Sequence, residues 1–189
     1  GTMFEWYDFF LYGALAGFIA RHFFSSVSES TGFIFALAAF AVGFVVRPVG
    51  ALVFGRIGDL VGRKNTFLAS LVIMGLSTVL VGFLPGYDTI GIAAPIILVG
   101  LRIMQGLAIG GEFGGAITYV AEHAPDDRRG LHTACIPATA MAGLLLSLIV
   151  IMATRTVIAP DAFDDWGWRV PFLISVLLLA VSFFIRLKL

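Results

Sequence analysis

The sequence predicts an all-α membrane protein with six transmembrane helices. Hydrophobic residues make up 59% of its 189 residues and charged residues 13%, and the mean hydropathy is +1.00. Soluble domains are about 45–50% apolar and about 25% charged, so lipid must cover part of this surface. The apolar runs reach about 20 residues, the length that a helix needs to cross a bilayer, whereas barrel strands need only about 9–11.

Short segments rich in Gly, Pro, Ser and Asp separate the apolar runs, and such segments are typical of turns. The separators are residues 25–32, 55–65, 85–91, 122–130 and 159–169. We therefore expect helices over residues 2–24, 33–54, 66–84, 90–121, 131–154 and 170–187. In lipid a helix satisfies its own backbone groups, which excludes irregular chain in contact with lipid.

The first expected helix carries acidic side chains. Glu5, Asp8 and Tyr12 are spaced by three and four residues, so they share one helix face. Two acids on one face of a spanning helix can hold protons or attract a cation. The alternative is that Glu5 is simply interfacial, and Tyr12 fits a packing role as well as a ligand role.

The second expected helix contains Arg47 and Pro48. Proline removes one backbone donor, so it should bend the helix there. Arg47 either snorkels toward the inner interface or contacts a substrate. The third, fifth and sixth helices follow from length and hydropathy, and Cys135 in the fifth is expected to be a small buried side chain.

The fourth expected helix carries the strongest functional signal, because Arg102, Gln105 and Glu112 lie in its apolar run. A charge at the bilayer centre costs about 2.5–3.5 kcal/mol on insertion scales, so such groups persist where they pair and serve a function. Arg102 and Glu112 are roughly 15 Å apart along the axis and cannot pair with each other. We expect Asp8 to be the partner of Arg102. Separating such a pair would favour protonation of the acid and couple proton binding to motion; the alternative is a static salt bridge.

Glycines recur every four residues in this helix. Small residues at this spacing let a neighbouring helix approach closely. The expected packing glycines are Gly106, Gly110 and Gly114 in one row and Gly111 and Gly115 in another.

The connections at 55–65 and 122–130 carry charges that predict a gate. The expected members are Asp59, Arg63, Lys64, Glu122 and Arg129. A cluster of these charges would close one face of the bundle and break when it opens. Ordinary enrichment of basic residues on the cytoplasmic side is the alternative, and it does not explain Asp59.

Basic residues also predict the orientation. One side of the bundle holds Arg56, Arg63, Lys64, Arg128, Arg129, Arg186 and Lys188, and the other holds Arg21, Arg155 and Arg169. The basic excess places the first of these sides, and with it both termini, in the cytoplasm. Trp166 and Trp168 are expected at the outer interface, where amphipathic rings prefer to lie.

Composition excludes several functions. The formal net charge is zero without a basic run, so nothing indicates a nucleic-acid partner. His22, His123 and His132 lie in separate segments without metal-binding spacing, and no nucleophile–base pair is evident. We expect no enzyme active site, metal or cofactor. The start lacks a basic n-region, so we expect no signal peptide.

Several motifs resemble one family of transporters. The pattern G-x-x-x-D-x-x-G-R-K at residues 55–64, R-x-x-Q-G at 102–106 and E-x6-R-G at 122–130 are similar to motifs of the major facilitator superfamily. EWYDF at 5–9, RPVGALVFG at 47–55, RIMQGLAIGGEFGGA at 102–116 and WGWRVPF at 166–172 resemble the metabolite:proton symporter family within it. Leu60 stands at a position that is usually basic, which weakens the inner charge network. The fifth helix has Pro137 and Gly143 but lacks the glycine-proline run of drug antiporters, which favours symport.

The resemblance implies the N-terminal half, over residues 1–189, of a twelve-helix transporter, built from two inverted three-helix repeats. The chain starts four residues before Glu5 and stops after the sixth helix, so we expect its first helix to be truncated and a second six-helix half to be absent. The implied function is symport of protons with small polar metabolites such as organic acids, betaine or proline. The energy source would be the proton gradient of the cell inner membrane, without a cofactor.

Within this interpretation, Asp8, Arg102 and Glu5 are the expected proton-coupling residues. The expected substrate-binding residues are Arg102, Gln105, Tyr12, Glu112 and Arg47. The alternative function is a six-helix bundle that does not transport: a fragment that is inactive without its second half, or a bundle that associates with a second copy.

Overall fold

The computed structural model describes residues 2–188, except for the side chain of Thr118. Its helices are α1 (Thr2–Ala14), α2 (Ala16–Phe23), α3 (Glu29–Val45), α4 (Arg47–Val61), α5 (Arg63–Phe83), α6 (Tyr87–Ile90), α7 (Ala93–His123), α8 (Arg129–Val157), α9 (Pro160–Asp165) and α10 (Val170–Lys188). Short 3-10 turns at Asp126–Arg128 and Gly167–Arg169 precede α8 and α10. Within residues 2–188 there is no strand, so the all-α prediction is confirmed.

Six long helical segments account for the predicted spans. Five of them in the described part of the chain are long and apolar enough to cross a membrane: Glu29–Val61, Arg63–Phe83, Ala93–His123, Asp126–Val157 and Gly167–Lys188. The sixth is α1 with α2. The amide of Leu15 donates to Leu11 O and that of Ile19 to Leu15 O, both at 3.0 Å, so the two pieces form one interrupted helix.

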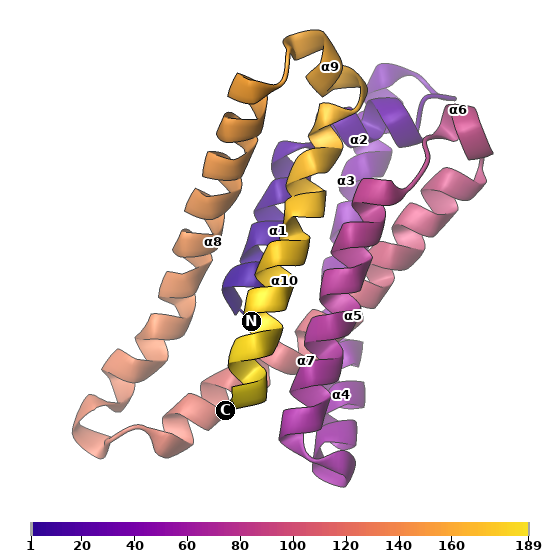
Figure 1. The fold of residues 1–189 in the computed structure, drawn as a ribbon. Coiled ribbons are helices and arrows are strands. Elements are labelled where there is room, and N and C mark those ends of the chain that lie inside the picture. Colours follow the sequence, from indigo (N-terminus) through magenta and orange to yellow (C-terminus); the bar gives the residue numbers. More distant parts are fainter. Residues whose placement is uncertain (1, 189) are drawn as a thin grey trace.

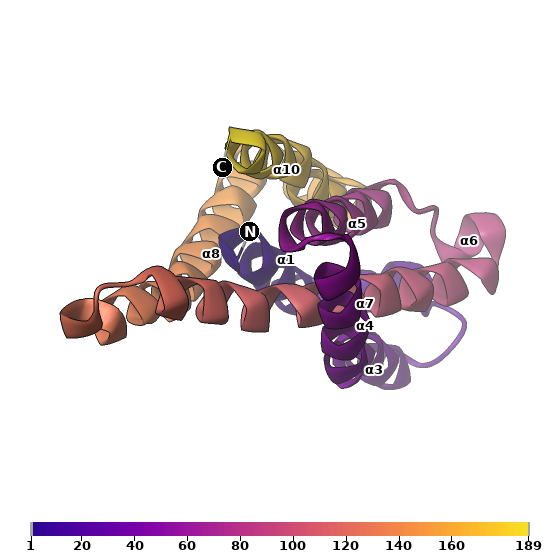
Figure 2. The same ribbon diagram turned by 90° about the horizontal axis from the view of Figure 1, so that it is seen from below.

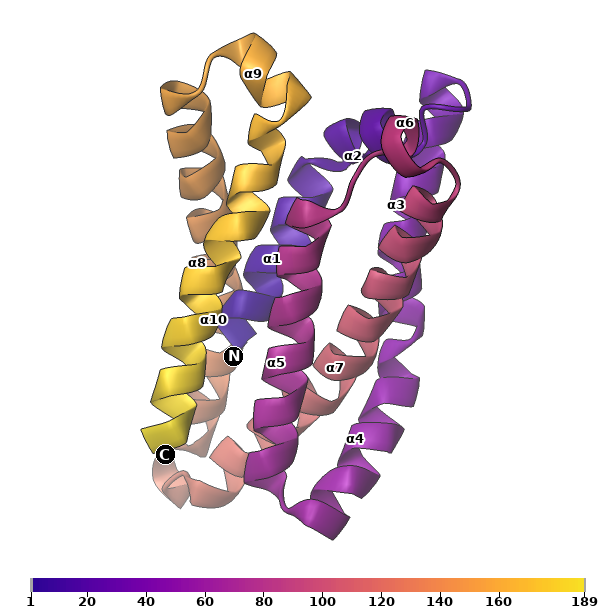
Figure 3. The ribbon, with the colours of Figure 1, turned by 45° about the vertical axis from the view of Figure 1, so that its right-hand side comes forward.

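The connections gather at two ends of the bundle (Figures 1 and 3). The α2–α3 connection, α6 and α9 lie at one end, called here the α9 end. The α4–α5 and α7–α8 turns lie at the other, called the Gly62 end, and the N-terminus lies about halfway between them. Seen from below, α7 extends across the molecule to meet the start of α8 (Figure 2).

Helix α1 lies in the interior of the bundle. It packs against α8 and α10 and also touches α3 and α7. Its buried side chains are Phe4, Glu5, Tyr7, Asp8, Leu11 and Tyr12. Gly143 allows α8 to come close, because a Cβ there would lie 2.8 Å from Met3 O and 2.9 Å from the amide nitrogen of Tyr7. The two acids of α1 are therefore enclosed by protein.

Small residues bring α7 into close contact with α3, α4 and α5. A Cβ added at Gly106 would overlap the carbonyl of Gly43, and one at Gly110 would overlap the carbonyl of Arg47. Gly111 faces Phe54 of α4, whereas Gly115 faces the ring of Phe67 of α5. These four contacts agree with the predicted packing role. A Cβ at Gly114, in contrast, would meet no atom of another helix within 4 Å.

The bend predicted at Pro48 is present. Helix α3 ends at Val45 and α4 starts at Arg47, with the proline in the first turn of α4. Proline is tolerated there because the first-turn amides have no partner within the helix.

The predicted loop over 55–65 is wrong. Helix α4 continues to Val61 and α5 begins at Arg63, so only Gly62 makes the turn. Its φ of 102° is one that glycine adopts at little cost. Gly55 and Gly58 stay helical, because glycine lowers helix propensity without forbidding the helix.

Two side chains differ in burial from the prediction. Cys135 is exposed on α8, where its thiol lies 3.4 Å from Leu131 O. It lies on a part of α8 that no other described helix covers. Trp168 is completely buried among Phe23, His22 and Phe172, so only Trp166 is placed as an interfacial ring would be. The local sequence around Trp166 and Trp168 does not indicate which of the two rings faces the interior of the bundle.

Candidate functional site

The centre of the bundle holds an ion pair between α1 and α7. Arg102 Nη1 donates to Asp8 Oδ2 at 2.9 Å. Asp8 is 1% exposed and Arg102 4%, so the pair is shielded from water. The sequence expectation that these two residues are partners agrees with this contact. A buried ion pair gains from low dielectric but must offset a large desolvation penalty, so it is weak evidence for a purely stabilising role.

Aromatic and polar groups hold the Arg102 side chain in place. Its guanidinium carbon lies 3.7 Å from the centroid of the Tyr12 ring. The Tyr12 hydroxyl donates to Ala36 O at 3.0 Å, and the residue is fully buried. Tyr12 therefore supports Arg102, and its predicted substrate contact stays a prediction.

Gln105 is oriented by α5. Its Nε2 donates to Thr78 Oγ1 at 2.8 Å, while the Thr78 hydroxyl donates to Met74 O at 3.1 Å. Thr78 was not identified from the sequence, because a threonine in an apolar run gives no signal of its own. The Thr78 hydroxyl can donate a hydrogen bond to the helix backbone and still accept one from Gln105.

A small cavity adjoins the ion pair. Its volume is about 20 Å³, and Asp8, Arg47, Arg102 and Gln105 line it with Phe9 and Phe44. That volume suits about one water molecule. Several buried atoms here have no hydrogen-bond partner among the described residues: Asp8 Oδ1, Arg102 Nε and Nη2, Gln105 Oε1 and Arg47 Nε. Buried polar atoms are usually satisfied, so these groups are available to a ligand, a proton or water.

Arg47 also lines a larger groove with Glu5. This groove, called here the Glu5–Arg47 groove, has a volume of about 490 Å³ and lies between α1, α4 and α7. Trp6, Phe44 and Phe113 contribute aromatic walls. The Arg47 guanidinium carbon lies 4.1 Å from the Phe44 ring centroid and 6.0 Å from that of Phe9. Glu5 is 3% exposed, so it is buried and not interfacial.

Glu112 belongs to a second ion pair. Arg186 of α10 donates from Nη2 to Glu112 Oε1, and from Nη1 to Phe67 O at 2.9 Å. Glu112 therefore connects α7 with α10 and does not line the cavity beside Arg102, and its predicted substrate role stays a prediction. No local pattern indicates this pair, because a basic residue near the end of a helix, such as Arg186, is also typical of the cytoplasmic side.

The predicted gate is only partly assembled at the Gly62 end. Arg63 Nη1 lies 3.6 Å from Glu122 Oε2, and both side chains are more than half exposed. Arg129 pairs with Asp126 instead, three residues away in its own turn. Among described residues, Asp59 and Lys64 have no ion pair within 4.0 Å, although Asp59 and Arg63 border the same hollow. The expected cluster including Arg129 and Asp59 is not formed in this structure.

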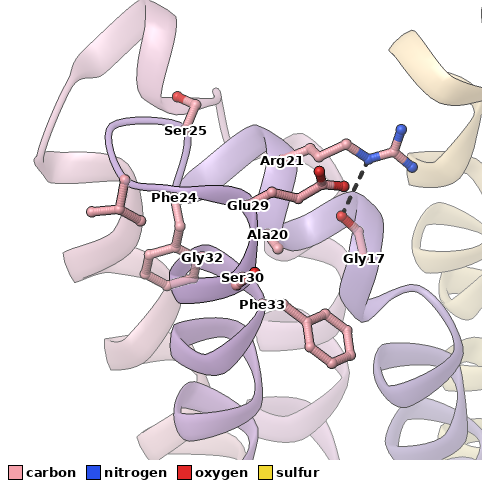
Figure 4. Close-up of a pocket in the computed structure, with 10 residues that line it drawn as sticks. Gly17, Ala20, Arg21, Phe24, Ser25, Glu29, Ser30, Gly32 and Phe33 are labelled. Carbon is pink, nitrogen blue, oxygen red and sulfur yellow. Dashed lines mark hydrogen bonds between the residues drawn. The ribbon is translucent and has the colours of Figure 1, made fainter.

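A wide hollow at the α9 end does not have the features of a binding site. It lies between α2 and α3, with a volume of about 800 Å³ (Figure 4). Arg21, Ser25 and Glu29 border it and are exposed, and Arg21 Nε donates to Gly17 O of its own helix at 3.4 Å. The charged groups with buried atoms that lack a hydrogen-bond partner among the described residues lie instead at Glu5, Asp8, Arg47 and Arg102.

Comparison with known proteins decides which family these residues belong to. The model of the sugar (and other) transporter family matches residues 1–189. The chain belongs to this family. Its fold resembles a solved major facilitator superfamily protein, the proton:xylose symporter XylE of Escherichia coli, with a TM-score of 0.86 and 18% identity. The match covers 100% of this chain and 42% of XylE, so the fold is that of a superfamily half. The predicted transporter family and fold are confirmed.

Two curated relatives come from Escherichia coli. The shikimate transporter is 41% identical over 187 residues, which covers 98% of this chain and 43% of the relative. The proline/betaine transporter is 40% identical over 186 residues, which covers 98% of this chain and 37% of the relative. The chain thus spans less than half the length of each. This family comprises transporters and not enzymes, and the chain is a multi-pass membrane protein.

Proposed function

We propose that this transporter chain forms the N-terminal half of a symporter that couples protons to the uptake of small polar metabolites. The observation that carries the proposal is the buried Asp8–Arg102 pair beside a cavity with unsatisfied polar atoms. Intramembrane ionisable groups are costly and typically mark ion and substrate pathways. Membership of a transporter family supports this interpretation of the pair.

Asp8 is the proposed proton acceptor. Once protonated, its carboxyl group no longer neutralises Arg102, and the guanidinium becomes free to donate hydrogen bonds to a polar group of the substrate. The Tyr12 ring, 3.7 Å from the guanidinium carbon, keeps Arg102 in the interior meanwhile. Proton entry would therefore prepare the site for substrate.

The proposed substrate contacts are Arg102, Gln105 and Arg47. These three residues line one cavity and present two unpaired nitrogens of Arg102, one oxygen of Gln105 and one nitrogen of Arg47. Such a set favours a small molecule with a carboxylate and a second polar group. Shikimate, proline and betaine have a carboxylate, and the names of two relatives include them.

A second six-helix half would complete the proposed transporter. Large apolar side chains are exposed along α3 and α4, among them Ile34, Val45, Leu52 and Leu60. The relatives are more than twice as long as this chain, which supports a partner half on part of that surface. Exposed charges such as Arg63 and Glu122 would then act at the cytoplasmic side of an inner-membrane protein. The chain would work by alternating access with its energy from the proton gradient and no cofactor.

The test is uptake by proteoliposomes that contain either this chain or the full transporter, in which the chain is joined to its second half. We expect the full transporter to accumulate radiolabelled shikimate, proline or betaine in response to an inward proton gradient. Collapsing the gradient with a protonophore should abolish accumulation. Asp8→Asn should retain exchange of substrate across the membrane but lose proton-driven accumulation.

The results separate the candidate functions. Uptake that is indifferent to the proton gradient would exclude symport. Full coupled uptake by Asp8→Asn would remove Asp8 from the mechanism. Uptake by the chain alone would show that six helices suffice, whereas no flux from either protein would favour a bundle that does not transport.

A further inference from the structure

We infer that Glu5 and Arg47 form a charge-exchange site, in which a substrate carboxylate replaces Glu5 as the counter-ion of Arg47 and Glu5 takes up a proton. This inference rests on the proposed function and adds to it a second proton, bound at a different residue from Asp8. It assigns the carboxylate of the substrate to Arg47.

Glu5 is buried and Arg47 is half-buried, and neither has a bonded partner among the described residues. Glu5 Oε1 and Arg47 Nε have almost no solvent exposure and no hydrogen-bond partner among the described residues. No ion pair within 4.0 Å joins Glu5 to Arg47 or to any other described cation, yet the two residues act on each other electrostatically and line the same groove. Arg47 lies on the Phe44 ring instead of on a carboxylate. A cation on a ring binds less strongly than one in a charge-assisted hydrogen bond, so a ligand carboxylate would improve its bonding.

The buried charges of the bundle balance only if Arg47 neutralises Glu5. Asp8 is paired with Arg102, and Glu112 with Arg186. Among the described residues, the charged groups that act on Glu5 are Arg47 on α4 and Arg186 on α10, and Arg186 is already bonded to Glu112; Asp8 on α1 acts on Arg47. Arg47 is thus the cation left over for Glu5. An ionised carboxylate that loses its cation in a buried place takes up a proton instead of remaining charged.

The exchange conserves charge. Before binding, the Glu5 carboxylate and the Arg47 guanidinium sum to zero. The ligand carboxylate then forms hydrogen bonds to Arg47, and a hydronium ion in the groove gives its proton to Glu5 and leaves as water. The site again sums to zero, so one carboxylate and one proton enter together. Release of the ligand reverses both steps.

The test measures binding rather than transport. The full transporter in detergent is titrated with shikimate, proline and betaine across a series of pH values, and proton uptake is followed with a pH-indicator dye in weak buffer. Wild type should take up one proton more per bound ligand than Glu5→Gln. By linkage, the Kd of wild type should rise with pH above the range in which Glu5 of the ligand-free protein is protonated. This rise should exceed that of Glu5→Gln by a factor of about ten per pH unit. Asp8→Asn should keep this additional proton.

Variants of Arg47 and an exposed acid complete the design. Arg47→Gln should weaken binding of shikimate and leave binding of its methyl ester unchanged, whereas Arg47→Lys should keep the linked proton. Glu29→Gln, at an exposed acid of the α9 end, should match wild type. A monodisperse chromatography profile and unchanged melting temperature show that each variant folds.

The inference is overturned if Glu5→Gln takes up as many protons as wild type, if Arg47→Gln binds shikimate and its methyl ester as wild type does, or if none of the three carboxylates binds. Failure of the proposed function looks different. If wild type takes up one proton more than Glu5→Gln on binding but shows no proton-driven uptake, only the proposed symport is contradicted. If uptake is proton-driven but Glu5→Gln takes up as many protons as wild type, only the charge exchange is contradicted.

Discussion

Individual ion pairs of this chain differ mainly in how far water reaches them. Glu112 is 2% exposed and contacts Arg186, whereas Arg63 and Glu122 are more than half exposed. Exposed pairs contribute about 0.2–1 kcal/mol, but removing one member of a buried pair leaves an uncompensated charge. The same chemistry therefore holds α7 to α10 and barely stabilises the contact at the Gly62 end.

Glu112→Gln should destabilise the protein. The change removes the negative charge that balances the Arg186 guanidinium and leaves it only neutral acceptors, and breaking a buried pair costs on the order of 3 kcal/mol. We expect a lower melting temperature in detergent, measured by loss of monodispersity after heating.

Glu122→Gln is the matched control, because it removes the acid of an exposed pair. Its melting temperature should stay close to that of wild type. If the melting temperatures of both variants equal that of wild type, the Glu112–Arg186 contact contributes nothing to stability.

The sequence identified one buried pair and missed the other for a physical reason. Asp8 and Arg102 each stand in the middle of an apolar run, so each requires a partner at a similar depth. Arg186 lies near the end of its helix, where a basic side chain can reach water, so its inward direction depends on the rotation of α10. That rotation is set by packing against α5 and α1, which local sequence does not report.

At the scale of helices, the α4–α7 contact depends on missing side chains. Gly110 meets the backbone carbonyl of Arg47 in α4. Gly106 meets that of Gly43 in α3 and the side chain of Val46, which caps α4, so α7 approaches the start of α4 closely. This contact also positions Arg47 beside Arg102, because both lie near it. Close packing of these two helices is therefore part of the site.

Gly106→Ala should weaken this contact. A Cβ at this position would overlap Gly43 O and the Val46 side chain, and over-packing costs about 1–3 kcal/mol. We expect a lower melting temperature together with weaker substrate binding, since separating α4 from α7 moves Arg47.

Gly100→Ala on the same helix is the control. No atom of another helix lies within 4 Å of its added Cβ, and alanine favours a helix over glycine by about 0.5–1 kcal/mol. Equal effects of the two substitutions would show that helix propensity, and not the contact, determines the result.

Helix boundaries were harder to predict than helix existence. The spacing of glycines predicts the close helix contact correctly, whereas the loop expected over 55–65 is helical except at Gly62. Water at the end of a membrane helix can satisfy its backbone, so nothing forces the helix to stop where apolar residues stop. The positive φ of Gly62 is a tertiary feature that the other glycines of this stretch do not share.

On the scale of the whole molecule, the connections and their charges sort to two ends (Figure 1). The Gly62 end includes Arg63, Lys64 and Arg129, and the α9 end is flanked by acidic residues such as Asp164 and Asp165. An excess of basic residues favours the cytoplasmic side. The expected orientation therefore applies to the complete bundle and can be tested in cells.

Labelling of single cysteines checks the orientation. In a Cys135→Ala background, a membrane-impermeant maleimide should label Ser26→Cys in intact cells and Asn65→Cys only after permeabilisation. Both positions are exposed, at the α9 end and the Gly62 end respectively. The reverse pattern would place both termini outside.

The ring beneath Arg102 has a kinetic consequence. Tyr12 is fixed through its bond to Ala36 O, so the guanidinium stays seated when the Asp8 carboxylate stops attracting it. The binding position at Arg102 then becomes available without a change of rotamer, and only after the proton has arrived. Binding at Arg102 would follow a compulsory sequence, proton first and substrate second, and initial-rate patterns at varied proton and substrate concentrations would display that sequence.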